Sequence, residues 1–421
     1  MSDKEDKKSY FISSSKKLFT NKKDDKNEHY FDGSTEIKFD GSTEEKKNGE
    51  VKAEFEKLVH SQVSKIINQK YDDIVLLSGA GSSICSDGNF GKTVSQIAEI
   101  IFEKMKNKDG LEVSEKKARS NVYSLSELAN KTRYKKVDKN GKLKGDFELE
   151  NFISHLIRYK SFAPEKGRKK FEKSLNEILE CIRDNTTYDY DSSKLKHAKV
   201  INTLSRKLKA PHKLSIVTTN YDVLFEEAAM SENYTVFDGF TFSEKPVFDE
   251  GMFDWNLVRE IPNIHTKEVE YKDKVINLLK IHGSLTWEKG EDGQILRKDK
   301  ESIEEIDKMV MIFPSSDKYA QSYQTPYFAL FAKFQELLRR PNTLLISTGF
   351  SFSDDHIAQM VIEAVKNNPG LTLLITDFNI DQTSKNWQAL LDLMEANHPV
   401  SFLKATLNDD LASYLGEQDE Y

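Results

Sequence analysis

The sequence predicts a doubly wound α/β fold, in which helices cover both faces of a parallel sheet. The first observation is a run of four apolar residues at 74–77, which does not alternate with polar residues. Such a run is typical of a strand buried on both faces. The second is that further apolar runs of strand length alternate with segments of helical periodicity along the chain. This alternation is the pattern of a Rossmann-like parallel sheet.

Each element follows from its own apolar spacing. After the first strand, strands are expected at 214–218, 275–281, 309–313, 343–347, 371–376 and 400–403. Helices are expected before and between them at 54–69, 94–101, 223–229, 326–339, 355–365 and 384–395. Apolar residues between the first βα unit and the second strand recur only at helical spacing, at 125–129, 147–157, 171–182 and 200–208. We therefore expect one domain over 51–421 that carries a helical insertion at about 105–210.

The first 50 residues are densely charged and contain few large apolar side chains. Such a segment buries too little apolar surface to offset the entropy lost on ordering, which predicts a flexible charged arm. The sequence Phe-Asp-Gly-Ser-Thr-Glu occurs twice, at 31–36 and 39–44. We interpret the repeat as a duplicated turn in this arm; a short recognition repeat is the alternative.

Composition excludes several classes of protein. The chain has 421 residues and a formal net charge of −7, which argues against a protein that binds nucleic acid directly. Its two cysteines, Cys85 and Cys181, can form neither a disulfide framework nor a four-cysteine zinc site, so no metal is expected. The sequence lacks a run of 18 apolar residues and an apolar signal core. We expect a cytoplasmic protein with no membrane contact.

A turn of small residues at 78–83 follows the first strand and precedes a helix. This arrangement brings backbone N–H groups and a helix N-terminus toward a phosphate, although a βα turn without a ligand has the same form. Two common nucleotide motifs do not fit. The dehydrogenase fingerprint needs glycine where Ile84 stands, and the P-loop needs glycine where Ser86 stands.

Polar residues follow three further strands, at 219–222, 282–284 and 349–353, and Asp377 follows a fourth. Each has a structural alternative: Asn220 and Asp222 can cap a helix, His282 can be a core histidine, and the loop from Gly349 can end in a helix cap at Asp354. In a doubly wound sheet, however, the carboxyl ends of the strands share one edge, where ligands bind. The turn at 78–83 and the tips at 219–222, 282–284 and 349–353, with Asp377 as a fifth, therefore predict one site.

The motifs GAGSS (79–83), TNYD (219–222), KIHGS (280–284) and STGFSFSDDHI (347–357) resemble, in order and spacing, those of the sirtuin-like family. They are most similar to its bacterial antiphage-defence branch, whose members destroy NAD. The resemblance covers roughly 55–405. It implies that Asn220 holds the nicotinamide ribose and the attacking water, with Asp222 beside it, and that His282 is the catalytic histidine. It implies NAD contacts by Gly79, Ala80, Gly81, Ser82, Thr219, Gly349, Ser351 and Asp377.

The chain departs from sirtuin deacylases because two cysteines cannot build their four-cysteine zinc module, which the helical insertion replaces. We therefore expect an NAD glycohydrolase that depletes NAD in abortive infection. An NAD-dependent deacylase and a non-catalytic NAD or ADP-ribose sensor remain as alternatives. The sequence ends at Tyr421 with no further sensor domain, so control is expected from homo-oligomerisation or a partner. By family inference, that partner is a HerA-type ATPase or an Argonaute-like protein.

Overall fold

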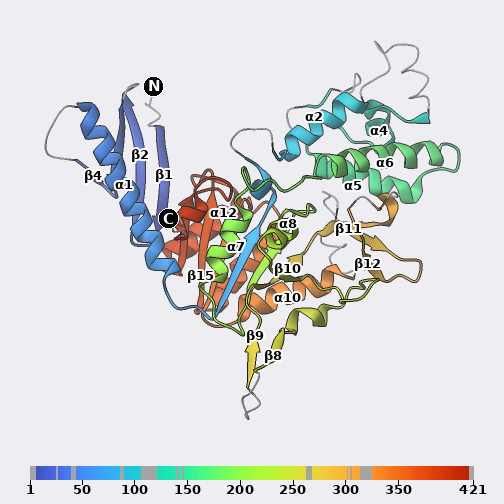
Figure 1. Ribbon diagram of the computed structural model, residues 1–421. Helices are drawn as coiled ribbons and strands as arrows, with labels where there is room; N and C mark the ends of the chain where they lie inside the picture. The colour runs from blue at the N-terminus through green and yellow to red at the C-terminus, as the bar shows by residue number, and fades with distance from the viewer. Residues whose placement is uncertain are drawn as a thin grey trace.

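The computed structural model describes residues 6–24, 27–38, 44–85, 90–105, 121–138, 142–144, 147–261, 268–300, 302–303, 306–312 and 325–416. Its centre is an 11-stranded sheet of order β4-β3-β2-β1-β16-β15-β14-β5-β6-β10-β7 (Figure 1). The seven strands from β16 to β7 are mutually parallel, whereas β1 to β4 pair antiparallel. The predicted α/β class with a mostly parallel sheet is confirmed.

The parallel strands coincide with predicted apolar runs, with one exception. They are β5 (Asp73–Ser78), β6 (Leu214–Thr218), β7 (Thr235–Phe237), β10 (Val275–Lys280), β14 (Thr343–Thr348), β15 (Leu371–Asp377) and β16 (Val400–Lys404). Every residue of β5, β6 and β14 is buried, because helices cover both faces of the sheet. Strand β7 is short and was not predicted.

Two hydrophobic cores lie on opposite faces of the sheet. Val75 and Leu77 of β5 belong to one core, and Ile74 and Leu76 belong to the other, as the period of two in a strand requires. The first face is covered by α10 (Tyr327–Arg339), α11 (Asp355–Asn367) and α12 (Lys385–Glu395). The second is covered by α1 (Glu44–Ile67), α7 (His197–Ser205), α8 (Leu224–Ser231) and α13 (Leu411–Tyr414).

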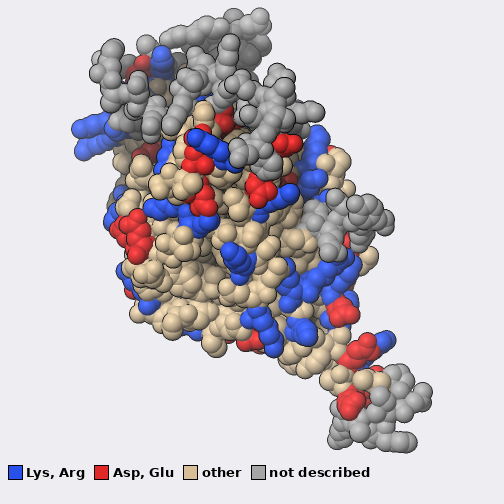
Figure 2. Space-filling view, turned by 90° about the vertical axis from the view of Figure 1, so that its left-hand side faces the viewer, with Lys and Arg blue, Asp and Glu red and all other residues tan. Residues whose placement is uncertain are grey.

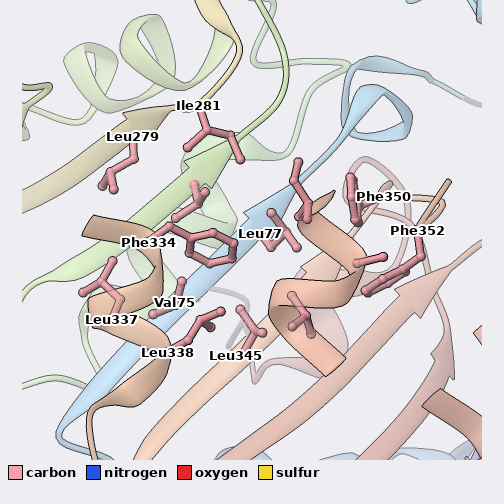
Figure 3. Packing of buried hydrophobic residues seen from close by; sticks show 14 of the residues in the cluster. Val75, Leu77, Leu279, Ile281, Phe334, Leu337, Leu338, Leu345, Phe350 and Phe352 are labelled. Carbon is pink, nitrogen blue, oxygen red and sulfur yellow. The ribbon is translucent and has the colours of Figure 1, made fainter. Parts of the chain in front are cut away.

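The first core reaches up to the edge of the sheet where the site was predicted. Figure 3 shows Phe334 of α10 between the strands and the helices, and Phe350 and Phe352 at the end of β14. Phe350 and Phe352 are both buried. The loop that follows β14 is therefore anchored in the core by its aromatic residues.

The N-terminal segment differs from the expected flexible arm. It forms the strands β1 (Asp6–Ser13), β2 (Lys17–Asp24), β3 (Asn27–Asp32) and β4 (Thr35–Glu36), which extend the central sheet beyond β16. Around Phe11 and Leu18, buried residues alternate with more exposed ones along the strand, and Phe11, Leu18 and Tyr30 pack on α1 in the second core. The overall composition of the segment does not show this alternation between buried and exposed positions. The prediction of a flexible arm is wrong for the described residues.

The first copy of the repeated hexapeptide forms the turn between β3 and β4, where Gly33 has a φ of +59°. This agrees with its interpretation as a turn. Most of the second copy lies outside the described residues, and its last residue, Glu44, begins α1.

The predicted helical insertion forms a third core. Its helices are α2 (Val94–Met105), α4 (Leu125–Thr132), α5 (Leu149–Phe162) and α6 (Arg168–Asp184). In Figure 1 they stand together to one side of the sheet. The expected bounds of about 105–210 need a shift, because α2 belongs to the insertion whereas α7 packs on the sheet.

The expected fourth strand of the central sheet is also misplaced. Residues Met309–Met311 form β13, which pairs with β11 (Gly283–Lys289) in a separate sheet of order β12-β11-β13, where β12 is Ile295–Arg297. Its apolar character reflects packing against the insertion, together with the short helix η4 (Ile306–Lys308).

A separate hairpin of β8 (Val258–Glu260) and β9 (Val269–Tyr271) follows the 3-10 helix η3 (Glu250–Asp254) and projects from the body in Figure 1.

Figure 2 shows basic and acidic side chains interspersed over the face that carries the N-terminal strands. Within the residues that the structure describes, no helix is long and apolar enough to cross a membrane.

Candidate functional site

The carboxyl ends of β5, β6, β10, β14 and β15 open into one cavity of about 530 Å³. Nine of the eleven predicted site residues line it: Ala80, Gly81, Thr219, Asn220, Asp222, His282, Gly349, Ser351 and Asp377. The other two, Gly79 and Ser82, are buried behind the cavity wall. The parallel register explains this convergence, because it aligns Ser78 with Thr218 and with Thr348 across the sheet.

The glycines after β5 and β14 allow these two loops to touch. Gly79 N–H donates to Thr348 O at 3.1 Å, and Gly81 N–H donates to Gly349 O at 2.9 Å. A Cβ atom on Gly349, whose φ is +59°, would lie 2.3 Å from the backbone nitrogen of Ser82. These glycines therefore serve close backbone contact between the loops. The N–H groups of Gly79 and Gly81 are engaged in that contact.

Asn220 fixes the glycine loop from the β6 side. Its Nδ2 donates to Gly79 O at 3.1 Å, to Ser82 Oγ at 3.1 Å and to Ser83 Oγ at 2.9 Å. The side chain is buried, and its backbone N–H donates to Thr218 Oγ1 at 3.0 Å. This orientation turns the amide nitrogen toward the loop and so determines where the amide oxygen points.

Asp222 is held from two directions. Its Oδ2 accepts from Ser83 Oγ at 2.7 Å, and its Oδ1 accepts from Leu224 N–H at 3.2 Å, at the start of α8. Burial raises the pKa of this carboxyl. The contact with Leu224 N–H agrees with a capping role for Asp222, and the contact with Ser83 joins Asp222 to the glycine loop.

Lys280 lies behind the same turn and is 1% exposed. Its ammonium donates to the backbone oxygens of Tyr221 and Asp222 and to Glu226 Oε1, the last at 2.9 Å. Burial raises the pKa of Glu226, although the Lys280 charge opposes that shift. The lysine of the KIHGS motif therefore stabilises the backbone that carries Asn220.

Asn408 clamps the glycine loop from the other side. Its Nδ2 donates to Ser82 O at 2.7 Å and to Ile84 O at 2.9 Å, and its Oδ1 accepts from Lys196 N–H at 3.1 Å. Sequence reasoning missed this residue because it follows β16, more than 300 positions from Ser82 and Ile84 and more than 200 from Lys196. No local pattern marks such a contact.

His282 follows β10 and is 5% exposed, so it is both a cavity residue and a buried one. Its Nε2 lies 3.5 Å from Asp354 Oδ2, within ion-pair distance when the imidazole is protonated. Asp354 also lines the cavity and accepts from the backbone N–H groups of His356 and Ile357 at the start of α11. The sequence identified Asp354 only as a helix cap.

The loop at 349–353 alternates between core and cavity. Phe350 and Phe352 are buried in the core, whereas Ser351 and Ser353 are exposed, and their hydroxyl oxygens lie 2.8 Å apart. Phe352 adopts a φ of +56°, which turns the chain into α11. The Phe-Ser-Phe-Ser pattern thus presents two hydroxyls to the cavity.

The remaining walls come from β15, from the segment after β16 and from the helical insertion. Asp377 ends β15, and its Oδ1 accepts from Asn379 N–H at 2.9 Å; burial raises the pKa of this carboxyl. The insertion supplies an apolar wall: Val94, Ile97, Leu149 and Ile182. At its rim, Lys92 Nζ donates to Asn185 Oδ1 at 2.8 Å, and burial raises the pKa of Tyr188 to about 12.

Among the described lining residues, the carboxylates outnumber the cations. The cavity is lined by four aspartates: Asp222, Asp354, Asp377 and Asp409. Among the described lining residues, Lys92 is the single lysine or arginine. A site of this kind favours positive charge that develops on a bound substrate. The described residues contain no group of three or more His, Cys, Asp or Glu side chains that could hold a metal ion.

Comparison with known proteins agrees with part of this assignment. Residues 214–393 match the family described as "SIR2-like domain", so this stretch is similar to sirtuin-like proteins. The match contains Asn220, Asp222, His282 and Asp377, but it does not include the glycine loop. No curated protein matches the sequence. A solved structure described as "Structural Basis for the Mechanism and Regulation of Sir2 Enzymes" aligns at 12% identity and a TM-score of 0.31, over 80% of this chain and 95% of that one.

Proposed function

We propose that the protein is an NAD glycohydrolase, which cleaves the bond between nicotinamide and ribose with water to give nicotinamide and ADP-ribose. The observation that supports this most directly is that Asn220 and His282, from the adjacent strands β6 and β10, line one cavity together with the glycine loop. The similarity of residues 214–393 to a SIR2-like domain supports NAD as the ligand.

NAD fits the residues that are present. The cavity volume of about 530 Å³ lies within the roughly 300–1,000 Å³ of small-molecule sites. Ala80, Gly349 and Ser351 would hold the pyrophosphate and the adenosine ribose, and Gly81, which has no side chain, would let the ligand approach the loop. Lys92 would supply positive charge toward the pyrophosphate. Asp377, at the end of β15, would lie near the adenosine ribose.

The charges of the cavity suit this reaction. Nicotinamide leaves as a neutral molecule, so the leaving group needs no general acid, and positive charge develops on the ribose. The surrounding carboxylates stabilise that charge. Asn220 would orient the ribose and the water through its amide oxygen. His282 would accept the proton that the water loses when its oxygen bonds to the ribose carbon.

The biological part of the proposal is NAD depletion in antiphage defence, through a homo-oligomer or a partner such as a HerA-type ATPase or an Argonaute-like protein. The motif resemblance supports the defence role. A cytoplasmic NADase needs restraint, and the helical insertion, which forms one wall of the cavity, is a reasonable element for a partner to move.

The test is to incubate the purified protein with NAD and measure nicotinamide and ADP-ribose, with and without its candidate partner. Asn220→Ala and His282→Ala should each lower turnover by about 10²–10⁴-fold, the usual contribution of a positioned base or its partner. His398→Ala and Asn367→Ala, which lie outside the cavity, are the matched controls.

Three results would contradict the proposal in different ways. Unchanged turnover in a folded Asn220 or His282 variant would remove the site assignment. NAD-dependent deacylation of an acyl-lysine peptide, with no hydrolysis of NAD alone, would support the deacylase alternative. NAD or ADP-ribose binding without turnover under any condition, with or without the partner, would support the sensor alternative.

A further inference from the structure

We propose that Asp354 is a positioning residue that orients His282 and adjusts its basicity. This inference rests on the proposed function, because it assigns a partner to the histidine of that site. Sequence reasoning treated Asp354 only as the cap of α11. The structure gives its two carboxylate oxygens different tasks.

One oxygen fixes the carboxylate to the backbone. Asp354 Oδ1 accepts from His356 N–H at 3.2 Å and from Ile357 N–H at 3.3 Å, the first amides of α11. These contacts cap the helix and hold the carboxylate in one position.

The other oxygen faces the imidazole. Asp354 Oδ2 lies 3.5 Å from His282 Nε2, and the two side chains are 10% and 7% exposed. A carboxylate on this side favours the imidazole tautomer that carries its proton on Nε2, which leaves Nδ1 as the basic nitrogen. It also stabilises the imidazolium that forms when His282 accepts a proton.

Other titratable groups lie on the elements around this pair. In the described part of the chain they include His356 and Asp355 of α11, Tyr327 of α10, Tyr221 and Asp222 after β6, and Lys280 on the strand of His282 itself. The Lys280 ammonium donates to Glu226 and to backbone oxygens. The His356 ring packs against the Phe331 ring, with 4.7 Å between the ring centroids. Asp354 is the carboxylate found within ion-pair distance of the imidazole.

The test separates the two tasks of the carboxylate. Asparagine caps a helix as well as aspartate, so Asp354→Asn keeps the cap and removes the charge. We expect unchanged unfolding, a KM for NAD within about 2-fold of wild type and a kcat lower by about 10–100-fold. The acid limb of the kcat profile should move to lower pH, because the imidazole loses the charge that favours its protonated form. Asp249→Asn, at the cap of the 3-10 helix η3, is the matched control.

A double variant completes the test. In the His282→Ala background, Asp354→Asn should have no further effect on kcat, since its role acts through the histidine. A wild-type kcat and pH profile in Asp354→Asn, with His282→Ala still impaired, would overturn this inference and leave the proposed function intact. An equal additional loss in the His282→Ala background would also overturn it. Absence of NAD hydrolysis by the wild-type protein with its partner would instead contradict the proposed function.

Discussion

Replacing Asn408 with leucine should weaken both the fold and the substrate site, because this side chain joins three separate parts of the chain. The substitution keeps the volume but removes two donors and one acceptor. Ser82 O is fully buried and would lose its partner at a cost of about 1–3 kcal/mol. Ile84 O and Lys196 N belong to half-buried residues, so water can partly replace the lost hydrogen bonds. The loss of each of these two bonds costs roughly 0.5–1 kcal/mol. The sum is about 2–5 kcal/mol.

The assay is urea unfolding combined with the KM for NAD of the folded fraction. Because Asn408 holds the backbone of the glycine loop, we expect KM to rise more than kcat falls. Asn367→Leu is the matched control, since Asn367 is exposed on α11 and bonds only within its own helix. Its unfolding free energy should change by less than about 0.5 kcal/mol. If Asn408→Leu unfolds at the same urea concentration as wild type, the hydrogen bonds of Asn408 do not stabilise the fold.

Two further predictions concern stability. Phe11→Ala should lower the unfolding free energy by about 3–5 kcal/mol in urea, because Phe11 is 2% exposed in the second core; a change near zero would restore the flexible arm. Burial lowers the pKa of His197 to about 3, so the folded state keeps this histidine neutral where the unfolded chain, near 6.5, binds a proton. Unfolding free energy should therefore fall as pH drops from about 6.5 toward 3. His197→Leu should flatten that slope, and an unchanged slope measured by urea unfolding would contradict the assignment.

The sequence predicted the parallel sheet well because burial on both faces leaves a direct mark on composition. The run at 74–77 contains no polar residue, the run at 343–347 has three apolar residues at its centre, and both are central strands. The rule that ligands bind at the carboxyl edge of such strands then placed Asn220 and His282 in one cavity.

The errors arose where a residue's role depends on distant partners. The N-terminal strands expose many charges on one face and bury only alternate residues, so their mean composition resembled that of an arm. Met309 and Met311 pack against the helical insertion and Val310 packs in the first core, so the apolar run alone could not show which sheet it joins. Asp354 and Asn408 are ordinary loop residues in sequence, and only the fold reveals the contacts that place them in the site.

The pairing of β1 with β16 affects how the protein is made. Phe11 lies opposite Leu403, so a ribosome must add about 390 residues before the first strand meets its neighbour. At roughly 5–20 residues per second, this takes about 20–80 seconds. During that time β1 can pair with β2 and pack on α1, whose contacts are local. The open edge of β1 is then a place where a chaperone or a second nascent chain can bind before β16 closes it.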